Sequence, residues 1–194
     1  MQTIDNSSDD TFRCFDRSEL ADIQRNTVKA LRVDRASYRF IKITNPARFR
    51  TFLAALLKEE AIVREPADHE PLPHLAINIG FTHSGLGQLS VSPAIIESFP
   101  QVFREGMAAR AAQLGDTGPA APQSWDGWLG TTDVHGVIVL SASPAEELRE
   151  LEARVGELVA PASADCFESL ECITGEWTRE DENAPRRDTN EFTY

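Results

Sequence analysis

The chain has 194 residues, and its 31 acidic side chains outnumber the 19 basic ones to give a net charge of −12. Hydrophobic residues make up 41% of the sequence, which is typical of a globular domain. Because an acidic surface repels phosphate, we expect neither nucleic acid nor an anionic membrane as a partner. No apolar run approaches the roughly 20 residues that cross a bilayer.

The start of the chain and its cysteines favour a cytoplasmic protein. Residues 1–10 are polar and lack the basic start and apolar core of a secretory signal. The three cysteines form no Cys-x-x-Cys pair and no disulfide framework, so we expect reduced thiols. We divide the chain into a flexible N-terminus (1–19), a folded domain (20–178) and a polar tail (179–194).

The first predicted strand, 38–43, is followed by a helix. Asn45 is a suitable cap and Pro46 suits the first helical turn, so we expect this helix to run to about Glu60. Three prolines between 64 and 73 indicate a loop. Residues 74–82 then alternate between apolar and other side chains, which predicts a second, half-buried strand.

A helical insert is predicted after the second strand. A short helix starts at Ser92–Pro93 and stops at Pro100, and a second helix carries Phe103, Met107, Ala111 and Leu114 on one face. Gly115 is placed to end that second helix. Residues 116–132 are rich in glycine, proline and tryptophan, and a loop of this length indicates a function or an interface.

The rest of the domain repeats the order strand, helix, strand. We predict a third strand at 134–140, a capping box at Ser143 to Glu146 with proline in the first turn, a helix continuing through Val159, and a fourth strand at 166–177. Without the insert, the order is β-α-β-β-α-β. This order predicts an α+β, ferredoxin-like fold with an antiparallel four-stranded sheet and both main helices on one face.

The apolar positions of these elements predict the core. It consists of Phe40, Phe52, Leu53, Leu56, Ile77, Ile79, Val137, Val139, Leu151 and Val155.

Read without reference to a family, the chain offers no convincing active site. His69 and His74, with Asp68 and Glu70, are candidate metal ligands, but their spacing fits no standard pattern and a solvated loop is the stronger interpretation. His83 and His135 lie near strand ends, where structural histidines are more common than ligands or bases. No nucleophile elbow, phosphate loop or dinucleotide-binding glycine motif is present.

Trp125 and Trp128 leave two interpretations open. They either anchor a partner or line a pocket, or they simply fill space under the long loop. We consider the second of these the stronger.

Four ordered segments carry a resemblance to a known family. They are Asp-Ile-Gln-Arg-Asn at 22–26, Asn-Ile-Gly-Phe-Thr-His-Ser-Gly-Leu at 78–86, the stretch 99–125 with Phe-Arg-Glu-Gly-Met-Ala-Ala-Arg at 103–110, and Asp-Val-His at 133–135. Together they resemble the N-terminal half of the dye-decolorising haem peroxidases. Two positions depart from that family, because Arg25 stands where glycine is usual and His83 where an aromatic residue is commoner.

The resemblance implies a haem-dependent peroxidase that uses hydrogen peroxide to oxidise dyes or phenolic substrates. Members of the family have two ferredoxin-like domains around one haem b. Their proximal histidine, distal aspartate and distal arginine all belong to the second half. Glu191-Phe192-Thr193-Tyr194 looks like the lead-in to the motif with the distal aspartate. We therefore nominate no catalytic, haem-binding or metal-binding residue, and we expect a partial chain that is inactive alone.

Two alternatives stay open at this point. One is a non-catalytic ferredoxin-like domain for interaction or dimerisation, so that the chain forms a homo-oligomer. The other is a small monooxygenase-type enzyme of the same fold, which the order of the four segments argues against.

Overall fold

The computed structural model describes residues 22–28, 33–59, 74–163 and 165–176. The predicted N-terminus and polar tail, the proline-rich loop and His69 lie outside these residues. The boundaries proposed for the folded domain therefore stay predictions. None of the described helices is long and apolar enough to cross a membrane.

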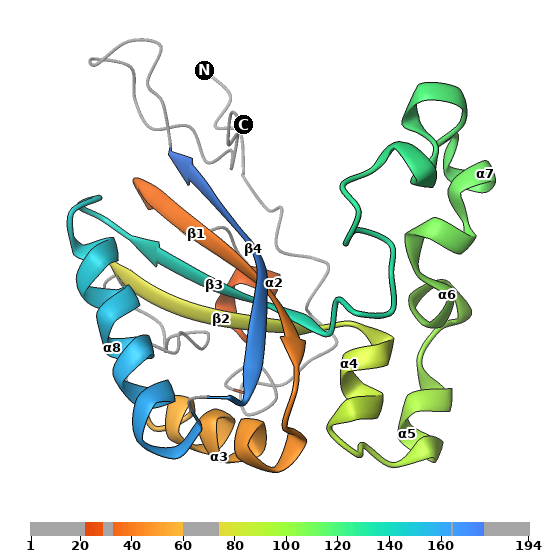
Figure 1. The fold of residues 1–194 in the computed structure, drawn as a ribbon. Coiled ribbons are helices and arrows are strands. Elements are labelled where there is room, and N and C mark those ends of the chain that lie inside the picture. Colours follow the sequence, from red (N-terminus) through yellow and green to blue (C-terminus); the bar gives the residue numbers. More distant parts are fainter. Residues whose placement is uncertain (1–21, 29–32, 60–73, 164, 177–194) are drawn as a thin grey trace, which may run out of the picture.

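The described residues form a four-stranded antiparallel sheet with the order β2-β3-β1-β4. Its strands are β1 (Arg35–Ile43), β2 (Leu75–Phe81), β3 (Gly136–Ala142) and β4 (Phe167–Glu176). Figure 1 shows α3 (Pro46–Leu56) and α8 (Glu147–Ser163) side by side on one face of this sheet. The α+β, ferredoxin-like fold is therefore confirmed.

The first main helix, α3, begins where its cap predicts. The side chain of Asn45 accepts a hydrogen bond from the backbone N–H of Arg48, and Pro46 is the first helical residue. The helix ends at Leu56, four residues before the expected end at Glu60.

The start of α8 differs from the sequence prediction. Helix α8 begins at Glu147, and the Ser143–Pro144 peptide bond is cis. The Ser143 hydroxyl donates to Asp34 Oδ2 at 2.6 Å instead of capping the helix. The predicted capping box is therefore wrong, because Asp34 just before β1 competes for its hydroxyl.

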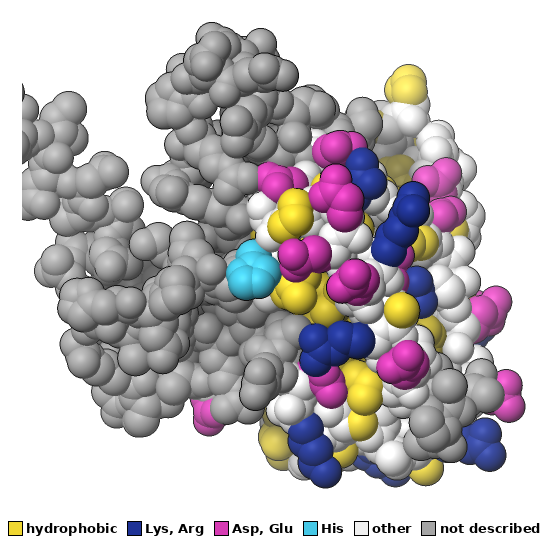
Figure 2. Space-filling view, turned by 90° about the vertical axis from the view of Figure 1, so that its left-hand side faces the viewer, with side chains coloured by type: hydrophobic (Ala, Val, Ile, Leu, Met, Phe, Trp, Pro, Cys, Tyr) yellow, Lys and Arg dark blue, Asp and Glu magenta, His cyan; other side chains and the backbone are white. Residues whose placement is uncertain are grey.

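The core lies between the sheet and the two helices. Phe49, Phe52 and Leu56 of α3 meet Leu148, Leu151 and Val155 of α8 over the inner face of the sheet. The rings of Phe49 and Phe52 also contact Phe167. The outer side of α8 is charged, and Figure 2 shows acidic and basic side chains interspersed with small hydrophobic areas on that side of the molecule.

The predicted core is right for the helices and wrong for part of the sheet. Phe52, Leu56, Ile77, Leu151 and Val155 are buried, and Leu53 and Ile79 pack against them. Phe40, Val137 and Val139 instead lie half-buried on the opposite face, while Ile41, Ile138 and Leu140 occupy the core. Residues 137–140 are all apolar, so their pattern does not specify which face points inward.

The helical insert lies beside the sheet in Figure 1 and consists of short pieces. They are α4 (His83–Gln88), α5 (Pro93–Ser98), α6 (Gln101–Ala109) and α7 (Ala111–Leu114), followed by the 3₁₀ turns η2 (Gly118–Ala120) and η3 (Pro122–Ser124). The single helix expected through Leu114 is interrupted at Gly106, and Met107 and Leu114 are exposed. Gly115 does end this region, in the left-handed conformation.

Candidate functional site

Three of the four segments that carry the family resemblance contact one another along β2 and the turn that follows it. Gln24, next to the short helix α2 (Arg25–Val28), pairs with the open edge of β2 through its side-chain amide. Its Nε2 donates to Ile79 O and its Oε1 accepts from Ile79 N, both at 2.8 Å. Asn78 Nδ2 also donates to Gln24 Oε1, at 3.3 Å. A glutamine side chain therefore takes the place of a neighbouring strand along this edge.

The turn between β2 and α4 is held by Thr82. Its hydroxyl donates to Val134 O at 2.6 Å and accepts from the backbone N–H of Gly85, which caps α4. Ser84 Oγ also donates to Val134 O, at 3.3 Å. These bonds join the turn after β2 to the segment that enters β3.

His135 connects the ends of three strands. Its backbone N–H donates to Ile41 O at 2.9 Å, and its carbonyl accepts from Thr82 N at 3.1 Å. Its Nδ1 accepts from the backbone N–H of Ile43 at 2.8 Å, which requires the neutral imidazole. The residue is only 5% exposed. The interpretation of His135 as a structural histidine is supported by these contacts.

Gly85 is required by the close approach of α4 to this histidine. A Cβ atom at position 85 would lie 1.8 Å from His135 O, a backbone atom that cannot move aside by itself. The family-like glycine of 78–86 and the histidine of 133–135 therefore form one packed corner.

An ion pair between Lys42 and Asp133 lies beside the corner formed by Gly85 and His135. Lys42 Nζ donates to Asp133 Oδ2 at 2.8 Å, and this hydrogen bond raises the pKa of the ammonium. Burial lowers the pKa of His135 below its ordinary value of 6.5, Asp133 opposes this shift, and Lys42 adds to it. The imidazole is therefore kept neutral at physiological pH.

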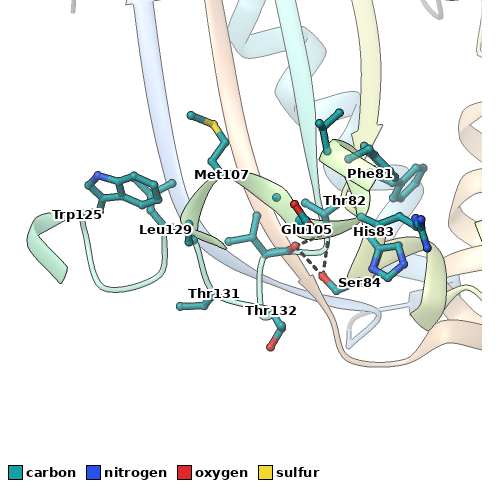
Figure 3. Close-up of a pocket in the computed structure, with 17 residues that line it drawn as sticks. Phe81, Thr82, His83, Ser84, Glu105, Met107, Trp125, Leu129, Thr131 and Thr132 are labelled. Atoms are coloured by element: carbon teal, nitrogen blue, oxygen red, sulfur yellow. Dashed lines mark hydrogen bonds between the residues drawn. The ribbon is translucent and has the colours of Figure 1, made fainter. Parts of the chain in front are cut away.

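A cavity of about 610 Å³ lies between the corner and the helical insert. Its apolar walls are formed by Phe81, Val102, Phe103, Met107, Ala108, Trp125, Leu129 and Val134. Figure 3 shows Met107, Trp125 and Leu129 on one side of the cavity, and Phe81, Thr82 and His83 on the other. We call this cavity the insert pocket.

The tryptophans of the long loop have different roles. Trp125 lines the insert pocket, whereas Trp128 packs on Phe40 with ring centroids 4.7 Å apart. The suspicion that 116–132 carries a pocket or an interface is supported for Trp125, while Trp128 covers part of the outer face of the sheet.

The described residues do not fit haem by themselves. His135 uses Nδ1 as an acceptor within the sheet corner, and His74 is exposed at the start of β2. His83 lines the insert pocket together with Arg104 and Glu105 of α6. Lining a common cavity does not by itself place them around one reacting atom, so no peroxide chemistry is assigned to them.

The described part of the chain also brings together no group of three or more potential metal ligands. The suggested ligands Asp68, His69 and Glu70 lie outside it. The insert pocket itself was not predicted, because its walls come from three segments distant in sequence, 81–84, 102–108 and 125–134. The one signal for it was the unusual loop 116–132.

The family model and the similar proteins all belong to the same family. A family model described as the DyP dimeric alpha+beta barrel domain matches residues 22–173. A dye-decolorizing peroxidase of Mycena epipterygia is 25% identical over 145 residues, which cover 74% of this chain and 26% of that protein. A second, from Auricularia auricula-judae, is 27% identical over 135 residues, with 69% and 25% covered. The chain thus spans about a quarter of the length of these relatives.

Solved structures agree with this comparison. An ancestral D-type dye-decolorizing peroxidase superposes with a TM-score of 0.70 and 26% identity, covering 84% of this chain and 36% of that one. A fungal DyP-type peroxidase from Auricularia auricula-judae gives 0.69 at 22% identity, covering 84% and 34%. The second likeness concerns the fold alone.

Proposed function

We propose that this chain is the N-terminal ferredoxin-like half of a haem-dependent peroxidase. The chain belongs to the dye-decolorizing peroxidase family, and the proposal starts from that membership. The observation that carries this proposal is the placement of Gln24 on the edge of β2 and of Thr82 and His135 where the end of β2 meets the start of β3. Each of these residues belongs to a segment on which the family resemblance rests, and each is held there by specific hydrogen bonds.

The role proposed for this half is to supply one wall of a two-domain assembly. The inner face of its sheet is covered by α3 and α8, whereas the outer face presents the half-buried apolar side chains of Tyr38, Phe40, Val137, Val139 and Ile173. A half-buried apolar face of this kind favours packing against a second sheet.

The haem b and the residues that act on peroxide are proposed to belong to the second half. When bound, haem supplies the iron at which peroxide is reduced. The chain's own residues would shape the sheet and the insert rather than bind iron, because the family resemblance places the iron ligand in the second half and His135 Nδ1 is bonded within the sheet. Hydrogen peroxide and an organic reductant follow as the proposed substrates, and the cytoplasm as the proposed location.

The alternative is a non-catalytic interaction domain in which two copies pair through the same outer face. The half-buried Val137 and Val139 favour such pairing as well, and the description of the matching family domain as dimeric is consistent with it. The two proposals differ in whether haem is ever acquired.

The test is to purify the product of the continuous reading frame that contains these 194 residues. The peroxidase proposal predicts one haem per chain, with peroxide-driven oxidation of a dye. A folded product without haem and without dye oxidation would overturn it in favour of the interaction domain. Sedimentation of that product would then show whether copies pair.

A further inference from the structure

The insert pocket has the size and the walls of a small-molecule site. Ligand cavities generally measure about 300–1,000 Å³ and are lined mainly by apolar and aromatic side chains with a few polar groups. The insert pocket measures about 610 Å³, and three aromatic rings contribute to it, those of Phe81, Phe103 and Trp125. The sheet and the insert each supply part of the wall.

The shape of the pocket is fixed by local structure on both sides. Gly106 in α6 has φ 72° and ψ 179°, a conformation that is essentially restricted to glycine, and it separates Phe103 from Met107. The Phe103 ring packs on Phe99 with centroids 4.8 Å apart. Across the pocket, Trp125 Nε1 donates to Ala120 O at 2.9 Å, which orients the indole. The cavity is therefore not a gap that a simple side-chain movement would close.

Several apolar side chains at the rim of the pocket are exposed to solvent. Val102 is 51% exposed, Met107 62% and Leu129 38%, so half of the six large hydrophobic side chains that are exposed in the described part of the chain border this one cavity. A concentration of exposed apolar surface around a concave site indicates a binding site. An apolar ligand would remove this surface from water.

The polar groups of the pocket, which also include His83 and Thr132, favour a ligand without net charge. The hydroxyls of Thr82 and Ser84 already donate to Val134 O, and that of Thr131 donates to Trp128 O. Arg104 and Glu105 both border the cavity and offset one another in charge. The net charge of −12 further disfavours an anion.

We propose that the insert pocket binds a neutral aromatic molecule of one or two rings. The ring system would lie between Phe81 on one side of the pocket and Trp125, Met107 and Leu129 on the other (Figure 3). This inference goes beyond the proposed function, and it does not depend on haem or on the second half of the protein.

The test uses the 194-residue chain and two fluorinated probes observed by ¹⁹F NMR. The neutral probe is 5-fluoroindole, and its anionic counterpart is 5-fluoroindole-2-carboxylate. We expect saturable line broadening with 5-fluoroindole and at least about tenfold weaker binding of the carboxylate, a difference of about 1.4 kcal/mol or more. Absence of saturable binding of 5-fluoroindole would overturn the proposal.

Adjacent alanines provide a matched pair of variants. Ala108 lines the pocket, whereas Ala109 is exposed and does not. Ala108→Phe fills the cavity and should weaken 5-fluoroindole binding at least about tenfold, while Ala109→Phe should leave it unchanged. Equal binding by the two variants would contradict the assignment. If Ala108→Phe fails to fold, Val102→Asn at the exposed rim should weaken binding several-fold, and unchanged binding would be equally contradictory.

The binding test has one further outcome, in which a second copy of the chain occupies the insert pocket. If a second copy of the chain occupies the pocket, sedimentation will show an oligomer that Ala108→Phe dissociates and Ala109→Phe does not. That result would replace the small aromatic ligand with a protein contact. A sedimentation profile that is the same for both variants, together with loss of probe binding only in Ala108→Phe, supports the small-molecule site.

Discussion

The neutral imidazole of His135 predicts a pH dependence of stability that can be isolated by substitution. The side chain accepts a hydrogen bond from the backbone N–H of Ile43 through Nδ1. Protonation of Nδ1 would turn this acceptor into a second N–H donor that faces the N–H of Ile43. Burial lowers the pKa of His135, and Lys42 adds to the shift against the opposing effect of Asp133. Folding therefore favours the unprotonated form.

The sign and the upper limit of the effect follow from proton linkage. Because the pKa of His135 is lower in the folded chain than its ordinary value of 6.5, the unfolded chain binds more protons between the two values. The contribution to stability is fully present above the unfolded pKa and is lost as the pH falls through the folded pKa. One proton limits the slope to about 1.4 kcal/mol per pH unit.

Two substitutions separate the titration from the hydrogen bond. In His135→Asn the amide oxygen reaches the position of Nδ1 and does not titrate, whereas His135→Ala leaves Ile43 N without its acceptor. At about pH 8, His135→Ala should lose about 1–3 kcal/mol of unfolding free energy. Between about pH 7 and pH 5, the wild type should lose stability more steeply than His135→Asn.

The assay is urea unfolding followed by far-ultraviolet circular dichroism at each pH. The two proteins differ only at position 135, so the difference between the two pH profiles reports His135. Parallel profiles for the wild type and His135→Asn would refute the reasoning, because they would mean that His135 has the same proton affinity in the folded and unfolded chain.

Three further substitutions test the fold. Leu56→Ala removes a fully buried side chain between α3 and the core and should cost about 2–5 kcal/mol in urea unfolding, so an unchanged midpoint would contradict its placement. Gly85→Ala forces a Cβ against His135 O and should cost about 1–3 kcal/mol, whereas Gly87→Ala in the same helix meets no atom within 4 Å and should not lower the melting temperature. Asn45→Ala removes the cap of α3 and should cost about 1 kcal/mol, measured in the same way.

The fold could be predicted because its local signals agree with its global topology. Asn45–Pro46 marks the start of α3, and alternation across 74–82 marks β2, so the order of elements indicated the ferredoxin-like pattern. The sequence prediction was wrong where a residue distant in sequence competes for the side chain that was expected to cap a helix. Asp34 takes the hydroxyl of Ser143, and α8 starts at Glu147 instead. The orientation of β3 was also ambiguous, because its residues are apolar on both faces.

The candidate site was less predictable, because it is built from contacts over long sequence separations. Gln24 pairs with Ile79 across 55 positions, and His135 bonds to Ile43 across 92. The interruption of α6 at Gly106 is hidden in the sequence by an apolar spacing that fits a continuous helix, and Met107, which follows the interruption, is exposed. The resemblance of Asp22–Asn26 to a family segment marked it as important but did not show which strand it would meet.

The most direct test of the account is a titration of the 194-residue chain with ferric haem, followed by absorbance spectroscopy and a dye-oxidation assay with hydrogen peroxide. The account predicts no binding at one haem per chain and no turnover above that of free haem, because the iron ligand is proposed to belong to the second half and His135 Nδ1 is bonded within the sheet. A histidine-ligated ferric spectrum at one haem per chain, with dye oxidation that is lost in His83→Ala, would contradict it.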